Sequence, residues 1–216
     1  MIYKHIIWDW NGTLVDDAWL CVEIMNNVLD KYKLKQISLS DYREMFVFPV
    51  KDYYAGLGFN LKKTPFEVCG LDFVNSFKNR KFDAPLFRES KKILSKIKLS
   101  GGENYLLSAN HQSILEDTVD FFKLRSLFSE VCGLNHYYAT SKIKEGKKLL
   151  SGIRSHKKNI VMIGDTLHDF EVAQSLKIDC LLLSHGHNNK ERLTKTSAPV
   201  FSSLKELAEF LRLTIN

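Results

Sequence analysis

Residues 6–13, which read Ile6-Ile7-Trp8-Asp9-Trp10-Asn11-Gly12-Thr13, decide the fold of this chain. The apolar run from Tyr3 to Trp8 is typical of a buried strand, and Asp9 stands at its carboxyl end. Asn11-Gly12 indicates a turn directly afterwards. We therefore expect a carboxylate at the tip of a buried strand.

The part of the chain that follows has a helical pattern. Apolar residues recur at helical spacing from residue 18 to about residue 80, and Asp16 or Asp17 is the expected cap of the first helix. Thr64-Pro65-Phe66-Glu67 has the pattern of a capped helix start. No strong strand is predicted in this part, although Met45–Val50 is ambiguous.

Beyond residue 85, short apolar strands alternate with helices. The expected strands cover residues 105–107, 160–163 and 180–183. The expected helices cover residues 89–97, 111–121, 143–151, 170–176 and 204–211. Apolar strands that alternate with helices favour a parallel sheet covered on both faces. We predict an α/β fold with a three-layer, Rossmann-like core formed by residues 1–14 and 86–216, and an inserted helical segment at residues 15–85.

Length and composition exclude several classes of protein. The 216 residues suit one core, and 31 basic against 25 acidic residues give a net charge of +6. The basic residues are scattered in short pairs, so no nucleic-acid partner is expected. No apolar run approaches the length of a membrane span and the first residues lack a signal-peptide pattern, so we expect no membrane association and a cytoplasmic location. The four cysteines lack zinc-ligand spacing and are expected to be free thiols. The oligomeric state is not predictable from the sequence.

Polar side chains follow three of the expected strands. They are Asp9 with Asn11, Ser108 with Asn110, and Asp165 with Asp169. In open α/β sheets, sites form beyond the carboxyl ends of the strands, so these groups are expected to converge. Asp9 and Asp165 together would make an oxygen-rich pocket suited to Mg²⁺.

The same segments resemble the motifs of the haloacid dehalogenase-like hydrolases. The segment Asp9–Asp16 resembles their first motif, DxDGT(L/V)xD, and Leu106–Asn110 resembles the second, an apolar strand that ends in Ser or Thr. Lys142 falls where the family places the lysine of its third motif, and Met162–Asp169 resembles the fourth motif, GDxxxD. The helical segment at residues 15–85 resembles the mobile helical cap of the phosphoglycolate phosphatase-like branch.

The resemblance implies a phosphatase that acts on a small phosphorylated substrate. Asp9 would attack phosphorus and form an aspartyl-phosphate. The implied Mg²⁺ ligands are Asp9, the backbone carbonyl of Asn11, Asp165 and Asp169, the last either as a ligand or as a group that orients Lys142. The groups implied to hold the phosphoryl oxygens are Lys142, Ser108 and the backbone N–H groups of Gly12, Ala109 and Asn110.

Asn11 departs from the family pattern. The phosphatases of the family usually have a second Asp at this position, which protonates the leaving alkoxide and later activates water. An amide cannot exchange a proton in this way, and general acid–base catalysis contributes about 10²–10⁴-fold. The loss is expected to hurt alkyl phosphates most, because aryl and acyl phosphates have better leaving groups. His111 and His168 are candidate replacement acids.

Two alternatives stay open at this point. The phosphonoacetaldehyde hydrolase branch also lacks the second Asp and uses a cap lysine to form a Schiff base, and Lys51 lies roughly where that lysine would fall. A chain that kept the fold but lost turnover would be a phosphate- or metabolite-binding module. The segment His185-Gly186-His187 is expected to be a loop that could lie near the site, and Trp10 could help to exclude water from it.

Overall fold

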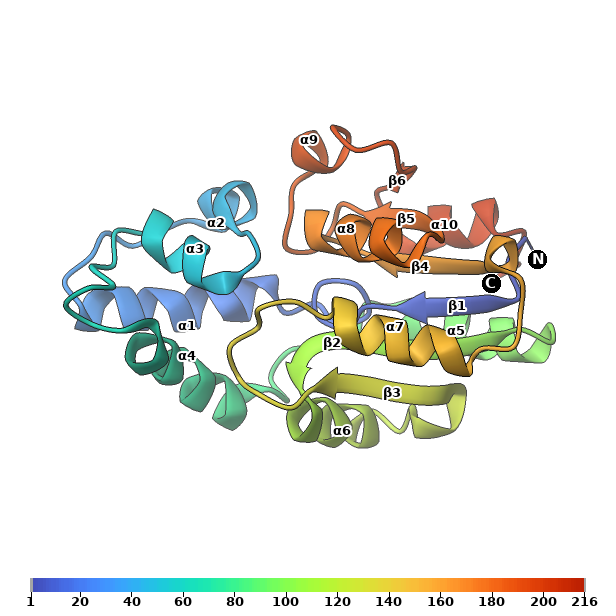
Figure 1. Cartoon of the computed structure of the whole chain (residues 1–216), viewed down its shortest axis with the longest axis horizontal. Helices are drawn as coiled ribbons and strands as arrows, with labels where there is room; N and C mark the ends of the chain where they lie inside the picture. Colours follow the sequence, from blue (N-terminus) through green and yellow to red (C-terminus); the bar gives the residue numbers. More distant parts are fainter. Residues whose placement is uncertain (1, 216) are drawn as a thin grey trace.

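The computed structural model describes residues 2–215, and within them six parallel strands form one sheet in the order β3-β2-β1-β4-β5-β6 (Figure 1). The strands are β1 His5–Trp8, β2 Glu103–His111, β3 Phe128–Leu134, β4 Ile160–Gly164, β5 Asp179–Leu183 and β6 Val200–Phe201. The first four helices are α1 Ala18–Lys31, α2 Leu39–Met45, α3 Val50–Gly56 and α4 Phe66–Arg80. The others are α5 Ser90–Leu99, α6 Gln112–Phe121, α7 Ile143–Gly152, α8 Leu167–Leu176, α9 Lys190–Leu193 and α10 Leu204–Phe210, with short 3₁₀ helices at Arg125–Leu127 and Lys157–Asn159.

Helices cover both faces of the sheet, which confirms the predicted fold class. Ile6 and Trp8 of β1 pack into a core cluster shared with α5, α6 and α10, whereas Ile7 packs into a second cluster shared with α7 and α8. Alternate side chains of a strand point to opposite faces, so Ile6, Ile7 and Trp8 of β1 all need to be apolar. This requirement explains the uninterrupted apolar run of the first motif.

The strand register brings the carboxyl ends of three strands level. Trp8 of β1 pairs with Leu106 of β2 on one side and with Ile163 of β4 on the other. The residues that follow these three positions therefore share one edge of the sheet. This edge is the one that the motif residues were predicted to occupy.

Helices α1–α4 are inserted between β1 and β2 and lie beyond the carboxyl ends of the strands (left in Figure 1). The exposed ion pair between Lys31 of α1 and Asp72 of α4 joins two of these helices, with Nζ and Oδ1 2.7 Å apart. Beneath it, side chains of α1–α4 pack into the same core cluster as one face of the sheet. None of the helices within residues 2–215 is long and apolar enough to cross a membrane.

Helix α2 is hydrogen-bonded to the loop that follows β5. Arg43 donates from Nε to the carbonyl oxygen of Gly186 and from Nη2 to that of His185, both at 2.8 Å. In the opposite direction, Arg192 donates from Nη1 to the carbonyl oxygens of Arg43 at 3.0 Å and Phe46 at 2.8 Å. We call these contacts the α2 clasp; they hold one part of the insertion against the sheet domain.

Two helix starts differ from the sequence predictions. Asp17 is the N-cap residue of α1, but its side chain makes no capping hydrogen bond and turns to the loop after β1 instead. The expected capped start at Thr64 is wrong by one residue, because α4 begins at Phe66 with Pro65 at the N-cap and no side-chain cap. The ambiguous segment Met45–Val50 joins α2 to α3 and forms no strand.

Three elements, one strand of ordinary length and two short ones, were not predicted. Strand β3 is an edge strand in which Ser129 and Glu130 are exposed, so it lacks the continuous apolar run of the central strands. Strand β6 has only two residues and helix α9 only four, which is too short for a periodic pattern. All three lie outside the segments that carry the motifs.

Candidate active site

Three buried carboxylates meet at the edge of the sheet where the carboxyl ends of β1, β2 and β4 lie side by side. Asp9 follows β1, Asp165 follows β4, and Asp169 lies in the first turn of α8. One oxygen of each lies within 4.8 Å of one oxygen of each of the others. The structure thus brings together the Asp residues of the first and fourth motifs, which stand more than 150 positions apart in the printed sequence.

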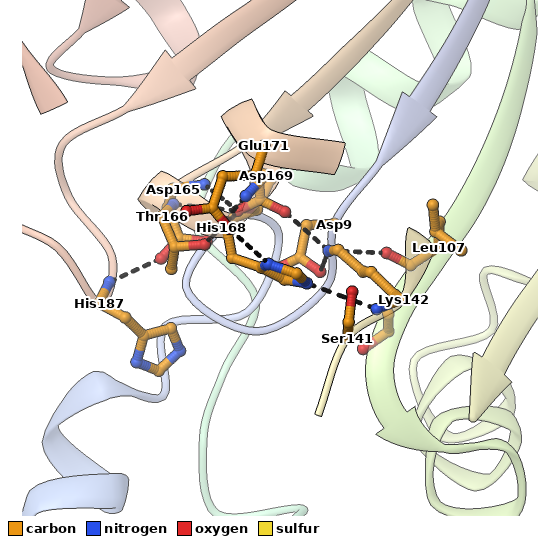
Figure 2. A network of polar contacts seen from close by, with 12 residues as sticks. Asp9, Leu107, Ser141, Lys142, Asp165, Thr166, His168, Asp169, Glu171 and His187 are labelled. Atoms are coloured by element: carbon orange, nitrogen blue, oxygen red, sulfur yellow. Dashed lines mark hydrogen bonds and ion pairs between the residues drawn. The ribbon is translucent and has the colours of Figure 1, made fainter. Parts of the chain in front are cut away.

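Lys142 reaches this carboxylate cluster from the residue before α7 (Figure 2). Its ammonium group pairs with Asp9 Oδ1, lies 2.7 Å from Asp169 Oδ1 and donates to the carbonyl oxygen of Leu107 at 3.1 Å. Only 2% of the residue is exposed. Three oxygen partners therefore hold the ammonium group beside Asp9.

Asp169 is occupied by contacts that position other groups. Its Oδ2 accepts hydrogen bonds from the backbone N–H groups of Asp165 at 3.1 Å and Thr166 at 3.0 Å, and from the Thr166 hydroxyl at 2.7 Å. Its other oxygen faces Lys142. Of the two roles that the sequence left open, these contacts favour orienting Lys142 over binding a metal.

Asp165 is held from both sides. Its Oδ1 accepts a hydrogen bond from the Thr13 hydroxyl and its Oδ2 accepts one from the backbone N–H of His187, both at 2.6 Å. A Cβ atom on Gly12 or Gly186 would overlap the Asp165 carboxylate. Gly12 also has a φ of +69°, which other residues rarely adopt. Glycine is therefore required where the loops after β1 and β5 enclose this carboxylate.

Asn11 is fixed by two neighbours. Its Nδ2 donates to the Asp17 carboxylate, and its Oδ1 accepts from Asn110 Nδ2 at 2.7 Å. Asp17 also accepts from the backbone N–H of Gly12 at 2.8 Å. Asp17, which the sequence suggested only as a helix cap, is thus a buried part of the site that sequence reasoning missed.

His187 completes this side of the site. Its Nε2 lies 3.4 Å from Asp17 Oδ1, and its Nδ1 lies 2.8 Å from the hydroxyl of Tyr42 on α2. The expectation that the His185–His187 loop could lie near the site is met by His187. The ring of His185 instead stacks on Phe87, with ring centroids 3.8 Å apart.

The second-motif residues lie on the other side of Asp9. Ser108 is buried, and its Oγ accepts a hydrogen bond from the backbone N–H of Asn110 at 3.1 Å. Ser108, Ala109 and Asn110 line the same cavity as Asp9 and Lys142. All the residues predicted to form the site are therefore found around this one place, with Gly12 packed behind Asp165.

The other residues considered from the sequence have different positions. His168 lines the cavity and stacks on Phe48, with ring centroids 4.6 Å apart, and burial lowers its pKa. His111 also lines the cavity and stacks on Tyr137. Trp10 is buried against Phe122 and is not among the cavity-lining residues, so it does not wall the site from water.

The charges at the site do not balance. All the buried carboxylates within residues 2–215 gather here, namely those of Asp9, Asp17, Asp165 and Asp169. Burial raises the pKa of Asp9 to about 8 and that of Asp165 to about 6, although Lys142 and His187 respectively oppose the shift. Burial would lower the pKa of His187, but the Asp17 carboxylate outweighs it and the pKa rises to about 9. Four carboxylates face one ammonium and one imidazolium, an excess of negative charge that a divalent cation would neutralise.

The donor set around Asp9 fits a hard divalent cation. Carboxylate and carbonyl oxygens are the ligands that Mg²⁺ takes from proteins, usually few in number. Asp9 and Asp165 supply carboxylate oxygens of this kind where the carboxyl ends of the strands meet, and Asn11, two residues after Asp9, supplies a backbone carbonyl. These residues are the ones that could hold the metal.

A cavity of about 170 Å³ extends from Asp9 toward the inserted helices. Its polar end is lined by Asp9, Asn11, Asp17, Ser108, Asn110, Lys142 and His187. Its other walls are mostly apolar or aromatic and include Met25, Tyr42, Phe46, Phe48, Val50, Tyr53, Tyr54, Phe66, Phe73, Val74, Phe77, Ile114, Tyr137 and Tyr138. Lys51, the Schiff-base candidate, is exposed on α3 and is not among the lining residues.

Comparisons with known proteins agree with this geometry. The sequence profile of the haloacid dehalogenase-like hydrolases matches residues 6–183. A predicted phosphatase from Clostridium acetobutylicum superposes with a TM-score of 0.81 at 17% identity, and the match covers 98% of this chain and 99% of that one. A predicted phosphoglycolate phosphatase from Haemophilus somnus superposes with a TM-score of 0.78 at 18% identity, with the same coverage.

The same fold also occurs in a protein named for a different activity. Protein tyrosine kinase A from Mycobacterium tuberculosis superposes with a TM-score of 0.77 at 17% identity, covering 97% of this chain and 98% of that one. No curated protein sequence matches the chain. At these identities the structural matches establish the fold, and the activity has to be argued from the site itself.

Proposed function

Because the chain belongs to the haloacid dehalogenase-like hydrolase family, we propose that it is a Mg²⁺-dependent phosphatase of a small phosphorylated substrate. One observation carries the proposal: Asp9 lies at the closed end of a cavity, paired with Lys142 and within reach of the Asp165 carboxylate. A nucleophile, a phosphate-binding cation and a metal-binding oxygen set are thus available at one point.

Asp9 is the proposed nucleophile. One of its oxygens pairs with Lys142, and the other has no hydrogen-bond partner among residues 2–215. That oxygen would attack phosphorus and form an aspartyl-phosphate, which divides one difficult displacement into two easier steps. Bound Mg²⁺ would neutralise charge between the carboxylate and the incoming phosphate.

Lys142 and Ser108 are the proposed phosphate-binding side chains. Lys142 is fixed by Asp169 and the Leu107 carbonyl, so its charge stays in place while Asp9 changes its bonding. Phosphoryl transfer depends mostly on positioning and charge stabilisation, and a pre-placed ammonium group supplies both. The backbone N–H groups that follow Asp9 and Ser108 are the further proposed donors.

Helices α1–α4, within residues 15–85, are proposed to act as a cap that closes over the substrate. They supply most of the apolar walls of the cavity, while the sheet domain of residues 1–14 and 86–216 supplies its polar end apart from Asp17. Closing such a cavity would exclude water from the phosphoenzyme. The exposed position of Lys51 gives no support to the phosphonoacetaldehyde alternative, so we do not advance it.

The test is turnover and covalent trapping with an Asp9→Asn variant. Wild-type protein with Mg²⁺ should release phosphate from at least one phosphomonoester or acyl phosphate. During turnover, intact-mass measurement should show a phosphate adduct that hydroxylamine removes. Asp9→Asn should lose both signals, whereas Asp52→Asn, a matched change on the exposed surface of α3, should keep both. Ligand binding without any turnover would overturn the proposal in favour of a binding module.

A further inference from the structure

The walls of the cavity limit what the phosphate group can be attached to. From them we infer that the substrate is an aryl phosphate monoester, in which the leaving group is an aromatic alcohol. The inference rests on the proposed phosphatase function and names the substrate class of the same site. It draws on three features: the aromatic walls, the confinement of the cationic side chains to the polar end of the cavity, and the amide of Asn11.

Aromatic side chains form the wall of the cavity that the inserted helices supply. Phe46 contacts three other rings of this wall, with ring centroids 5.1 Å from Tyr42, 5.4 Å from Phe48 and 5.3 Å from Tyr53. The whole cavity, polar end included, has a volume of about 170 Å³, close to the volume of about 150 Å³ that binds benzene in an apolar protein cavity. One aromatic ring fits this space, and the edges and faces of the surrounding rings are suited to pack against it.

The apolar part of the cavity offers no site for an anion. Among the residues that line the cavity Lys142 is the only Lys or Arg, and it is engaged by Asp9 and Asp169 at the phosphate end. The imidazolium of His187 also lines the polar end, and it is engaged by Asp17. Glu67, which lines the wall beside the aromatic residues, is itself acidic. A carboxylate or a second phosphate on the substrate would therefore be desolvated without a partner, which is unfavourable. This excludes phosphoglycolate-like substrates and favours a leaving group without negative charge.

The aromatic wall of the cavity contains one buried hydroxyl group that could bind a polar substituent. Tyr53 lines the cavity, and its buried hydroxyl has no hydrogen-bond partner among residues 2–215. Leaving a buried hydroxyl unpaired is unfavourable, so a ligand that brings a hydrogen-bonding group would relieve it. A ring with one neutral polar substituent matches this requirement.

The chemistry of Asn11 points to the same class. A phenol, like the Tyr side chain, has a pKa of about 10, whereas an alkanol, like water, has a pKa of about 16. An aryl oxygen can therefore leave as the anion where an alkyl oxygen needs a proton. Asn11 offers only an amide, and that amide is already bonded to Asp17 and Asn110. A site that lacks the general acid is suited to the better leaving group.

The reaction then balances without a further reactant. Asp9 attacks phosphorus, and the bond between phosphorus and the aryl oxygen breaks with both electrons going to that oxygen. Water then cleaves the aspartyl-phosphate, which restores the Asp9 carboxylate and gives inorganic phosphate, and the phenolate takes up the proton that the water released. The sum is aryl phosphate plus water giving phenol plus hydrogen phosphate.

Four substrates with Mg²⁺ separate the effect of the ring from that of the leaving group. Phenyl phosphate has a ring and a good leaving group, cyclohexyl phosphate has a ring of similar size and a poor leaving group, acetyl phosphate is small with a good leaving group, and phosphoglycolate is small with a poor one. We expect the highest kcat/KM for phenyl phosphate. Cyclohexyl phosphate should have a similar KM but a kcat lower by about 10²-fold or more, the range that a missing general acid accounts for. Acetyl phosphate should have the higher KM.

The outcomes distinguish the two proposals. If none of the four is hydrolysed, and no phosphate adduct forms on Asp9, the phosphatase function itself fails. If acetyl phosphate or phosphoglycolate is hydrolysed with a kcat/KM equal to or above that for phenyl phosphate, only the aryl inference is overturned. Equal kcat values for phenyl and cyclohexyl phosphate would likewise contradict it.

A pair of charge substitutions on α4 tests the aromatic wall directly. Val74 lines the cavity and is half-buried, whereas its neighbour Asn75 is exposed and does not line it. Val74→Asp should lower kcat/KM for phenyl phosphate by about tenfold or more relative to acetyl phosphate, because it buries a charge against the ring. Asn75→Asp adds the same charge to the same helix and should leave both unchanged. Should Val74→Asp not fold, the four-substrate comparison on the wild type still decides.

Discussion

Replacing Asn11 with Asp tests how the loop after β1 is held together. The Asn11 amide donates to the Asp17 carboxylate, and its carbonyl accepts from Asn110. A carboxyl at position 11 can still accept from Asn110, but when ionised it has no hydrogen to give to Asp17. Two carboxyls at hydrogen-bond distance do not both ionise readily, so the pair should retain one proton well above the ordinary carboxyl range.

The stability cost of Asn11→Asp should therefore depend on pH. While the pair keeps its proton, the new carboxyl donates to Asp17 as the amide did, and the cost is small. Once the proton is lost, a hydrogen bond to a charged group is lost as well, which is worth about 1.5–3 kcal/mol. Because the native pair binds more protons than the unfolded chain, the variant loses stability as pH rises. For a chain of this length, 2 kcal/mol corresponds to a Tm lower by about 4–8 °C.

The same proton should change catalysis in Asn11→Asp. A protonated carboxyl at position 11 is the general acid that the wild type lacks, and it should raise kcat for cyclohexyl phosphate by about 10²-fold or more. Phenyl phosphate, which needs no such acid, should gain far less. Phosphate release and thermal unfolding, each followed at about pH 5 and about pH 8, measure both effects.

A double variant supplies the control for this reasoning. Asn11→Asp combined with Asp17→Asn reverses donor and acceptor, and it should recover most of the stability lost at high pH. A Tm difference that does not change with pH would refute the shared proton. An equal gain in kcat for the two esters would refute the missing acid as the limiting feature.

Three further predictions concern the metal, the charges and the positioning of the ammonium group. Saturating Mg²⁺, at about 100 times its Kd, should stabilise the protein by about 2.7 kcal/mol and raise its Tm by about 5–10 °C. Asp165→Asn should remove this shift. A wild-type Tm that Mg²⁺ does not change would contradict the metal site. In EDTA, the free energy of unfolding measured with urea should fall from pH 4 to pH 8. The reason is that the pKa values of Asp9 (about 8), Asp165 (about 6) and His187 (about 9) are raised, so the native state binds more protons than the unfolded chain. Mg²⁺ should make the free energy of unfolding less dependent on pH. A free energy of unfolding that rises with pH would contradict the raised pKa values. Asp169→Asn should lower kcat by about 10–100-fold, because it releases Lys142. The variant should keep most of the Mg²⁺-induced Tm shift. Loss of that shift would show that Asp169 is a metal ligand.

Much of the fold was predictable because the central strands are buried on both faces. The buried parts of such strands are apolar, so β1, β4 and β5 appear in the sequence as short apolar runs, apart from His5 and Asp179 at the starts of β1 and β5. The edge strand β3 escaped prediction since its exposed residues are polar. Chain topology then made the convergence of Asp9 and Asp165 predictable, because parallel strands present their carboxyl ends at one edge.

The inner contacts of the site were not predictable in the same way. Asp17 stands where a helix cap is expected, and no local pattern shows that its carboxylate turns back to Asn11 and Gly12. His187 follows a strand in what looks like an ordinary loop, and only the tertiary fold places it between Asp17 and Tyr42. Interactions between residues distant in sequence leave no local periodicity, so only the structure reveals them.

The α2 clasp makes the two sides of the cavity unequal in strength. Arg43 and Arg192 give four charge-assisted hydrogen bonds to backbone carbonyls, and such bonds are worth about 1.5–3 kcal/mol each. On the opposite side, the segment after α4 meets α6 through the ion pair between Lys81 and Asp117, whose carboxylate is exposed, and exposed pairs contribute about 1 kcal/mol or less. The exposed rings of Phe82 and Phe121 also stack there, with centroids 4.4 Å apart, and such a ring pair adds about 0.5–1.5 kcal/mol. Helix α2 should consequently stay fixed against the loop after β5, while α4 moves away from α6. Substrate should enter and product should leave beside α4.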